Sequence, residues 1–364
     1  MKLAIPKEGD DPRVAITPDA VRKLAEFGIE VCVEKGAGQG AFYADEDYDS
    51  ATLLDRDALL KDASMVLSIH PLPDEDLAKL QPETVVIAEF KPFAEPKVAD
   101  HLRSMNLRAF SLDMIPRTTL AQSMDILSSM ASIAGYKAVL EASQLLPRYF
   151  PMMITAAGSI RPATVLVLGA GVAGLQAIAT ARRLGAQVEA FDTRSAAKEE
   201  VKSLGGKFIE IEGATEDTGA GGYAVEQSEE FLKRQREEVQ NRAIKADVII
   251  TTAQVRGRKA PLLVPKSTVD QMKPGSVIVD LAASTGGNCE LTQDNQTIVH
   301  NGVTILGNSN LAALMPQNAS QLYANNVVNF LKILVKDGEF HLDLGNEIIR
   351  GAYITPAPEA NENE

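Results

Sequence analysis

Short apolar segments alternate with stretches of helical periodicity along most of the chain. Residues 165–168 form an uninterrupted apolar run, which is typical of a parallel strand covered on both faces. Other segments of this kind are separated by helical patterns, turns and glycines. This repeated order of strand and helix predicts an α/β fold with parallel sheets.

The first hundred or so residues follow this pattern without a phosphate-binding loop. Thr17 and Pro18 are typical of a helix start, and Gly28 closes that helix. The glycines of residues 35–42 lead into an acidic segment, so a loop is expected there. The expected strands are 2–6, 29–33, 65–69, 84–90 and 108–112, with further helices at 74–80 and 95–105.

The segment 163–194 carries the most specific pattern, a GxGxxG motif between a strand and a helix. The glycines are Gly169, Gly171 and Gly174. They give a tight turn, close approach of backbone to a pyrophosphate, and close packing of helix on strand. The helix expected at 172–184 presents N–H groups and a positive dipole end to phosphates. The segment therefore predicts a dinucleotide-binding βαβ unit.

The residues after the second strand of this unit, 187–191, bear on which dinucleotide is bound. Asp192 lies about twenty residues past the motif, where a carboxylate accepts both hydroxyls of the adenosine ribose. A 2′-phosphate would be repelled there, so Asp192 favours NAD over NADP. Arg194 is the opposing signal, because an arginine beyond this strand can serve NADP.

The remaining pattern extends this second domain. The expected strands are 207–211, 247–252, 277–282 and two runs within 297–306, and the expected helices are 198–204, 229–243 and 266–272. The carboxyl ends of its strands, at Leu168, Phe191, Thr252 and Asp280, should line the ligand crevice.

Two further segments each allow two interpretations. Residues 113–146 form a loop to about Ala121 and then a long helix, on which Asp125 and Ser128 share one face. That face either binds a ligand at a domain junction or is an ordinary solvated surface. Residues 213–227 are glycine-rich around Tyr223, which fits either a mobile lid or a passive linker.

The C-terminal pattern sets the expected domain boundaries. A long helix at 317–335 and two short strands around Gly345 cannot form a domain alone, so they should pack on the first one. We therefore expect a first α/β domain at 1–128 and 315–355, and a Rossmann domain at 129–314. Residues 356–364 are an acidic tail without a core.

Composition narrows the function classes. A net charge of −13 argues against nucleic-acid binding, which needs a concentrated basic face. Cys32 and Cys289 match no metal-ligand spacing, and the four histidines are scattered, so no metal site is expected. No signal peptide or membrane-spanning run is visible. A cytoplasmic protein is expected, with no membrane span of its own.

These residues carry a family resemblance over Met1 to about Thr355. The chain resembles the NAD-binding component of proton-translocating NAD(P) transhydrogenases, the separate alpha subunit found where that enzyme is split over several chains. The motifs are RVAITP at 13–18, AQSMDILSS at 121–129, AGY at 134–136, PMM at 151–153, TAAG at 155–158, GVAGLQAIATARRLGA at 171–186, AGGYA at 220–224 and DLAxxxGGN at 280–288.

The resemblance implies a fold, a reaction and partners. It implies two Rossmann-like domains with NAD(H) in the cleft between them, and hydride transfer from NADH to NADP(H) on a partner subunit. Proton translocation would belong to a separate membrane-spanning subunit. A homodimer is implied, peripheral on the inner face of the cytoplasmic membrane through its partners.

The resemblance also implies site residues. Arg117, Gln122, Asp125 and Ser128 would act at the nicotinamide end, with Gln122 reaching toward NADP; Gly222 and Tyr223 would form the lid. The full expected cofactor set is Arg117, Thr118, Thr119, Gln122, Ser123, Met124, Asp125, Ser128, Gly169, Ala170, Gly171, Val172, Gly174, Asp192, Thr193, Arg194, Gly222, Tyr223, Gln235 and Gln254.

Two other functions remain open. Alanine dehydrogenase shares the fold, and its substrate site resembles this chain at Arg13. The other positions differ: Ser68 stands near the lysine position, residues 85–100 hold no histidine, and Ser284 stands at the aspartate position. An amino-acid dehydrogenase needs a proton acceptor, which these positions do not supply. The third possibility is a module that senses NADH without turnover.

The chain departs from the transhydrogenase pattern at two positions. Gln254 replaces a leucine and Met130 replaces a glutamine that are common in that family. Both changes are expected to tune the site locally and to leave its function intact.

Overall fold

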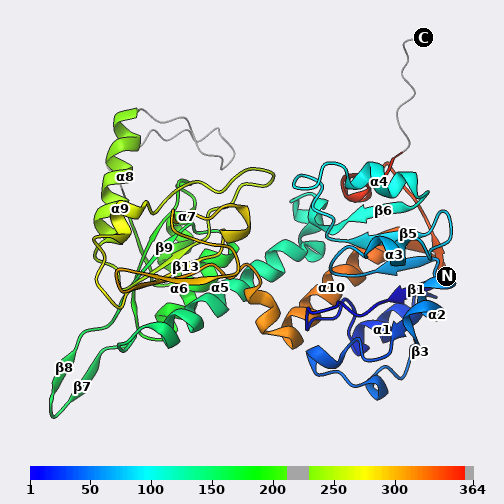
Figure 1. Cartoon of the computed structure of the whole chain (residues 1–364), viewed down its shortest axis with the longest axis horizontal. Coiled ribbons are helices and arrows are strands. Elements are labelled where there is room, and N and C mark those ends of the chain that lie inside the picture. Colours follow the sequence, from blue (N-terminus) through cyan, green and yellow to red (C-terminus); the bar gives the residue numbers. More distant parts are fainter. Residues whose placement is uncertain (211–228, 357–364) are drawn as a thin grey trace, which may run out of the picture. The chain divides into compact units, whose positions relative to one another are not determined.

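The computed structural model describes residues 1–210 and 229–356. The chain forms two compact units (Figure 1). Unit 1 contains Met1–Met130 and the chain from Ala313, and unit 2 contains Ala131–Ala312. Among the described residues, no helix is both long and apolar enough to cross a membrane.

Unit 1 is built on a parallel sheet. Its strands are β1 (Lys2–Ile5), β2 (Glu30–Glu34), β3 (Thr52–Leu54), β4 (Met65–Leu67), β5 (Val85–Ala88) and β6 (Arg108–Ser111), and its helices are α1 (Pro18–Ala25), α2 (Arg56–Lys61), α3 (Asp74–Leu77), α4 (Val98–Ser104), α10 (Pro316–Leu334) and α11 (Glu347–Ala352). The strand order is β3-β2-β1-β4-β5-β6, and all neighbours are parallel.

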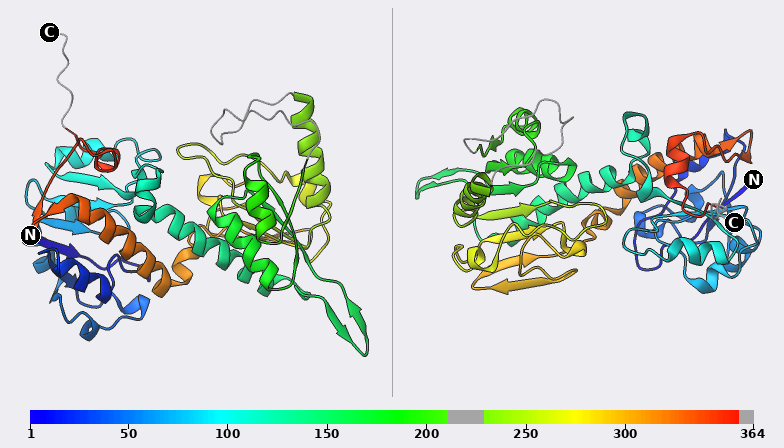
Figure 2. Two further views of the ribbon diagram at one scale, coloured as in Figure 1. Left: turned by 180° about the vertical axis from the view of Figure 1, so that it is seen from behind. Right: turned by 90° about the horizontal axis from the view of Figure 1, so that it is seen from above.

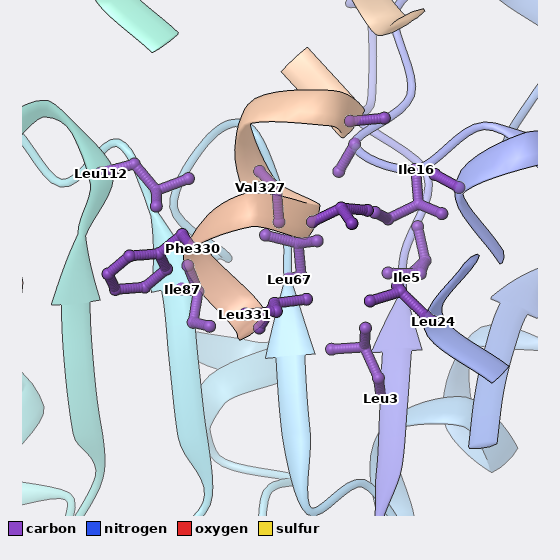
Figure 3. Close-up of a cluster of buried hydrophobic side chains, with 14 of the residues drawn as sticks. Leu3, Ile5, Ile16, Leu24, Leu67, Ile87, Leu112, Val327, Phe330 and Leu331 are labelled. Atoms are coloured by element: carbon purple, nitrogen blue, oxygen red, sulfur yellow. The ribbon is translucent and has the colours of Figure 1, made fainter. Parts of the chain in front are cut away.

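The C-terminal helix α10 belongs to the core of unit 1. Its residues Phe330 and Leu331 are fully buried among Leu3, Leu67 and Ile87 of the sheet (Figure 3). Helices α2, α3 and α4 contribute to a second core on the opposite face, because successive strand side chains point to opposite sides. The C-terminal segment thus supplies α10 to the core of unit 1.

Unit 2 has a seven-stranded sheet, in the order β11-β10-β9-β12-β13-β15-β14. Its strands are β9 (Thr164–Leu168), β10 (Gln187–Phe191), β11 (Lys207–Phe208), β12 (Val248–Thr251), β13 (Val277–Asp280), β14 (Thr297–His300) and β15 (Val303–Leu306), and its helices are α5 (Ile126–Leu145, which begins in unit 1), α6 (Val172–Arg183), α7 (Ala197–Ser203), α8 (Glu229–Ala243) and α9 (Lys266–Val269). Only the edge strand β14 pairs antiparallel. The predicted α/β class with parallel sheets is confirmed.

Apolar side chains fill both faces of this sheet. Helices α5, α6 and α7 pack on one face and α8 and α9 on the other. A hairpin of β7 (Met153–Thr155) and β8 (Gly158–Ile160) extends away from the rest of unit 2 (Figures 1 and 2). The sequence patterns predicted neither this hairpin nor β3 and α2, which are short or exposed.

The prediction of two strands around Gly345 is right for the first strand and wrong for the second. The first is β17 (Glu339–Phe340), which pairs antiparallel with β16 (Val335–Lys336). Residues 347–352 form helix α11. The Asn346 side chain accepts hydrogen bonds from the N–H groups of Ile348, at 2.9 Å, and Ile349. This N-cap satisfies donors that a helix start leaves free. Ile348 and Ile349 are then buried in unit 1, as a helix face allows.

Candidate functional site

The GxGxxG turn joins β9 to α6 in unit 2, and its three glycines meet different surroundings. A Cβ on Gly174 would lie 1.9 Å from the carbonyl oxygen of Gly169, and a Cβ on Gly169 would lie 2.5 Å from Oγ1 of Thr252. Gly169 also has φ of +102°, a region that favours glycine. A Cβ on Gly171 would meet no atom within 4 Å. Two glycines therefore permit packing, and the third leaves open space beside the amide end of α6, where phosphates bind.

Helix α5 packs against the start of α6. A Cβ on Gly135 would lie 2.1 Å from the carbonyl oxygen of Ala173. Any larger residue would push the two backbones apart at the first turn of α6. The AGY motif at 134–136 thus has a steric explanation in unit 2.

Asp192 is bound to the glycine turn. Its Oδ2 accepts from the N–H of Ala170 at 2.7 Å, and its Oδ1 accepts from the N–H of Arg194 at 2.8 Å. The Arg194 guanidinium donates to both oxygens, at 3.0 and 3.1 Å, and also to the carbonyl of Ala170. Burial tends to raise the pKa of Asp192, but these donors outweigh it and lower that pKa.

This arrangement bears on the choice between NAD and NADP. A carboxylate offers about four lone-pair sites, and Ala170 and Arg194 occupy them. The Arg194 side chain of this ion pair is 43% exposed. Asp192 and Arg194 therefore form one hydrogen-bonded ion pair beside the turn.

A second buried carboxylate, Asp280 at the end of β13, orders the neighbouring loops. It accepts from the hydroxyls of Thr251 and Thr292 at 2.9 and 2.7 Å, and from three backbone N–H groups of residues 282–289. Asn288 in turn exchanges hydrogen bonds with both backbone groups of Ala253. The motif DLAxxxGGN contains both residues, but its letters alone did not reveal this positioning role.

In unit 1, residues 116–128 form the segment predicted to meet the nicotinamide. A 3₁₀ helix at Thr119–Met124 precedes α5, and Gln122 on it is exposed. The α10 side chains Asn326 and Asn329 donate to the carbonyl of Ser123 at 2.8 and 3.2 Å. This segment is thus fixed to the core helix of its unit.

The placement of Asp125 on the face of the long helix is wrong. Asp125 precedes α5 with ψ of 90°, so it is not helical. Its Oδ1 accepts from the N–H of Ser128 at 2.9 Å, and its Oδ2 accepts from the Ser128 hydroxyl at 2.6 Å. Asp125 therefore caps the helix. Nε of Arg117 lies 4.0 Å from Oδ2 of Asp125.

The other predicted residues are distributed over both units. The glycine turn contains Ala170 and Val172, and Thr193 follows β10. Gln254 follows β12, and its side-chain amide donates a hydrogen bond to the carbonyl of Leu281. Gln235 lies on α8. Met124 is buried in the unit 1 core, whereas Thr119 and Ser123 are exposed. Gly222 and Tyr223 lie outside the described residues.

Thr118, also in the predicted set, has an unusual environment. Its hydroxyl is the one buried side-chain polar atom without a hydrogen-bond partner among the residues that the structure describes. An orphaned buried hydroxyl costs free energy, and a ligand that offers a polar group can relieve that cost.

Arg13 is already paired. Its Nε and Nη2 donate to the two oxygens of Asp11 at 3.0 and 2.6 Å, and its Nη1 points at Sδ of Met130 at 3.4 Å. Both side chains are at most 5% exposed. The fork that would grip a substrate carboxylate in an amino-acid dehydrogenase is therefore occupied by an internal carboxylate.

His70, which the sequence patterns did not connect with Arg13, belongs to the same network. Its Nε2 lies 2.8 Å from Oδ2 of Asp11. This hydrogen bond to a carboxylate favours the charged ring and raises the pKa of His70. The expectation that no titratable base accompanies Arg13 is thus corrected, because β4 ends beside the loop after β1.

Glu8 completes this network. Its carboxylate accepts from the N–H groups of Ile69 and His70 at 2.6 and 3.0 Å. Burial raises the pKa of Glu8 to about 7, although both hydrogen bonds oppose that shift. Unit 1 thus gathers several titrating groups at the carboxyl edge of its sheet, of which Asp11 is buried and His70 is partly exposed.

The fold and these sites define a class of protein: a two-unit α/β protein of Rossmann type with a dinucleotide-binding turn in its second unit. Residues 4–134 match the N-terminal domain, and residues 138–360 the C-terminal domain, of alanine dehydrogenase/PNT proteins. The chain belongs to this family.

Relatives cover the whole chain. An NAD(P) transhydrogenase alpha-subunit chain of Rhodospirillum rubrum is 44% identical over 98% of this chain and 96% of its own length. A transhydrogenase crystal structure from Sinorhizobium meliloti has a TM-score of 0.90 at 40% identity and covers 98% of both chains. Alanine dehydrogenase of Bacillus subtilis is 26% identical over 98% of this chain and 91% of its own.

The Glu8 and His70 pairings predict a pH dependence of stability. Both groups have raised pKa values, so the folded state holds their protons more tightly than the unfolded state. Their contribution is complete at low pH. That of Glu8 is lost as pH rises through about 7, and that of His70 is lost as pH rises through its raised pKa. The midpoint temperature of thermal unfolding of unit 1 should therefore decrease when the pH is raised from 5 to 8.

Glu8→Gln keeps a hydrogen-bond acceptor but cannot ionise, so it should flatten this fall. The exposed Glu75→Gln on α3 is the matched control and should behave like the unchanged protein. For each variant, calorimetry would measure the unfolding temperature as a function of pH. Hydrogen exchange at the amides of Ile69 and His70 would measure local stability. An identical pH profile in the Glu8 variant would refute the assignment.

Proposed function

We propose that this chain is the NAD(H)-binding component of a proton-translocating NAD(P) transhydrogenase. NADH bound here passes its hydride directly to NADP held on a partner subunit. A separate membrane-spanning subunit couples that redox step to proton movement. The pairing of Arg13 with Asp11 favours this proposal over an amino-acid dehydrogenase, in which the arginine would bind a substrate carboxylate. The similarity to the R. rubrum chain, which covers 98% of this chain, also supports it.

The residues of the glycine turn fit the phosphate end of NADH. Open space beside Gly171 and the free N–H groups at the start of α6 suit a pyrophosphate. Asp192 suits the adenosine ribose once Arg194 turns away. Ala170, Val172 and Thr193 would contribute through their positions on the turn.

The segment at residues 116–128 fits the nicotinamide end. The orphaned hydroxyl of Thr118 lacks a partner that a bound carboxamide or ribose would supply. We propose that Asp125 and Ser128 fix the carboxamide and that Arg117 and Gln122 reach the reacting ring. The same proposal includes Thr119, Ser123, Met124, Gln235 and Gln254 as supporting contacts, and Gly222 with Tyr223 as a lid.

This reaction needs no acid or base from the chain. Hydride transfer between two nicotinamides releases no substrate proton, so the chemistry is supplied by the cofactors. The residues above have to bind, orient and exclude water. Fixing the 116–128 segment through Asn326 and Asn329 serves that orientation.

The proposal includes an assembly. We propose a homodimer, attached to the inner face of the cytoplasmic membrane through its membrane-spanning and NADP-binding partners. Support for a second copy comes from the β7–β8 hairpin, whose residues Met152, Ile154 and Ile160 are exposed. Apolar side chains on an exposed hairpin are typical of an interface.

The first prediction from this proposal separates the three function classes. The purified chain should bind NADH without reducing NAD in the presence of alanine. Mixed with the NADP-binding partner, it should transfer hydride from NADH to an NADP analogue. Robust alanine turnover would favour the dehydrogenase alternative, and binding without transfer would favour a sensing module.

A second prediction concerns the ribose contact. Asp192→Ala should lower the affinity for NADH about tenfold or more, because it removes a charged hydrogen-bond acceptor. Arg194→Gln should change the affinity for NADH by less than about threefold, since it frees the lone pairs of Asp192 for the ribose. Fluorescence titration with NADH and NADPH measures both. Unchanged NADH affinity in Asp192→Ala would remove the proposed role.

A third prediction concerns Gln122. Gln122→Asn should slow hydride transfer about tenfold or more while NADH affinity changes less than about twofold, because a group acting at the reacting ring affects the rate selectively. Gln81→Asn, exposed in the same unit, is the matched control. Equal losses in affinity and rate would mean that Gln122 only binds NADH.

A further inference from the structure

We propose that the loop at residues 253–261, here called the basic loop, docks an acidic surface of the NADP-carrying partner subunit. It follows β12 and carries Arg256, Arg258 and Lys259. The inference rests on the proposed function, since it concerns the partner that receives the hydride.

The charge of this loop stands out from that of the chain. The protein carries a net charge of −13, yet no acidic residue occurs from Val248 to Val269. Arg256, Arg258 and Lys259 are all exposed, and none of them forms an ion pair with a described residue. Among the described residues, nothing neutralises these charges, which can act on a molecule that approaches the loop.

The base of the loop is held firmly at both ends. Asn288 donates from its side-chain amide to the carbonyls of Ala253 and Pro261, at 2.9 and 2.8 Å, and accepts from the N–H of Ala253 at 3.0 Å. The N–H of Ala260 also donates to the carbonyl of Thr285. Because Asp280 orders the residues around Asn288, the buried network of the site sets the position of the loop.

The tip of the loop is shaped by a turn. The N–H of Arg258 donates to the carbonyl of Val255 at 3.1 Å, and Gly257 has φ of +71°. A turn with glycine at this position projects the two flanking arginines outward. Lys259 lies over Gly286, where a Cβ would come within 2.9 Å of its Cε. The three cations thus sit on an ordered surface.

The loop lies beside the dinucleotide turn. It leaves the carboxyl end of β12, which pairs with β9, the strand before the glycine motif. The hydroxyl of Thr252, just before the loop, donates to the carbonyl of Gly169 at 3.1 Å. The basic loop therefore borders the same edge of the unit 2 sheet that presents the GxGxxG turn.

Direct hydride transfer explains why a partner must reach this edge. The two nicotinamides have to approach to about 3–3.5 Å, so the partner must dock on the NADH site, and the basic loop borders the part of that site that unit 2 supplies. An acidic protein repels an acidic partner at long range, and a local positive patch reverses that field where docking occurs. An acidic partner surface is the complement that fits Arg256, Arg258 and Lys259.

The test is the triple variant Arg256→Gln, Arg258→Gln, Lys259→Gln. The matched control removes the same charge from exposed residues elsewhere in unit 2, by Arg161→Gln, Arg183→Gln and Lys245→Gln. Calorimetry with the purified NADP-binding subunit gives affinity at about 20 mM and about 500 mM salt, where screening differs strongly. Fluorescence titration gives NADH affinity for each variant.

We expect the triple variant to bind the partner about five- to tenfold more weakly at low salt, with the difference lost at high salt. The control triple should bind as the unchanged protein does, and NADH affinity should be unaltered in both. Unaltered partner affinity in the basic-loop variant would overturn the inference and identify a solvated loop. If the triple variant binds NADH more weakly but binds the partner unchanged, the basic loop contacts the phosphates of NADH and does not dock the partner.

Failure of the proposed function would look different. If the unchanged protein neither binds the NADP-binding subunit nor transfers hydride to it, the transhydrogenase proposal itself fails. If the unchanged protein does both and the triple variant is identical to it, only the docking inference fails.

Discussion

Close contact between backbone atoms around the glycine turn is the constraint on which unit 2 depends. At Gly174 and Gly135 a Cβ would fall within 2.1 Å of a carbonyl oxygen, and no side chain fits such a space. These approaches bring β9, α6 and α5 together with the amide end of α6 free. The open space at Gly171 then remains for a ligand, so packing and binding use the same residues.

Two buried carboxylates extend that constraint to the rest of the carboxyl edge. Asp192 ties the end of β10 to Ala170, and Asp280 organises the loops that follow β12 and β13. Each is stabilised by several donors, which is the condition for burying a charge. This edge of the sheet is therefore ordered by hydrogen bonds to carboxylates at the ends of two strands, and the basic loop is anchored to the second of them.

Unit 1 uses buried charges differently. Asp11 receives both Arg13 and His70, and Glu8 receives two backbone N–H groups. In a dehydrogenase site of this family an arginine has to be available for the substrate. Here Arg13 is instead held by the internal carboxylate of Asp11, and both side chains are at most 5% exposed.

The sequence by itself determined the parallel strands and the dinucleotide turn, because apolar runs and glycine sterics act within a few neighbouring residues. It misjudged α11, since the Asn346 cap was not recognised, and it placed Asp125 on a helix that it caps. Only the tertiary structure decided the charge network of unit 1, whose partners His70 and Asp11 are 59 residues apart. It also decided the anchoring of the basic loop, since Asn288 and Ala253 are 35 residues apart and meet only when β12 and β13 pair.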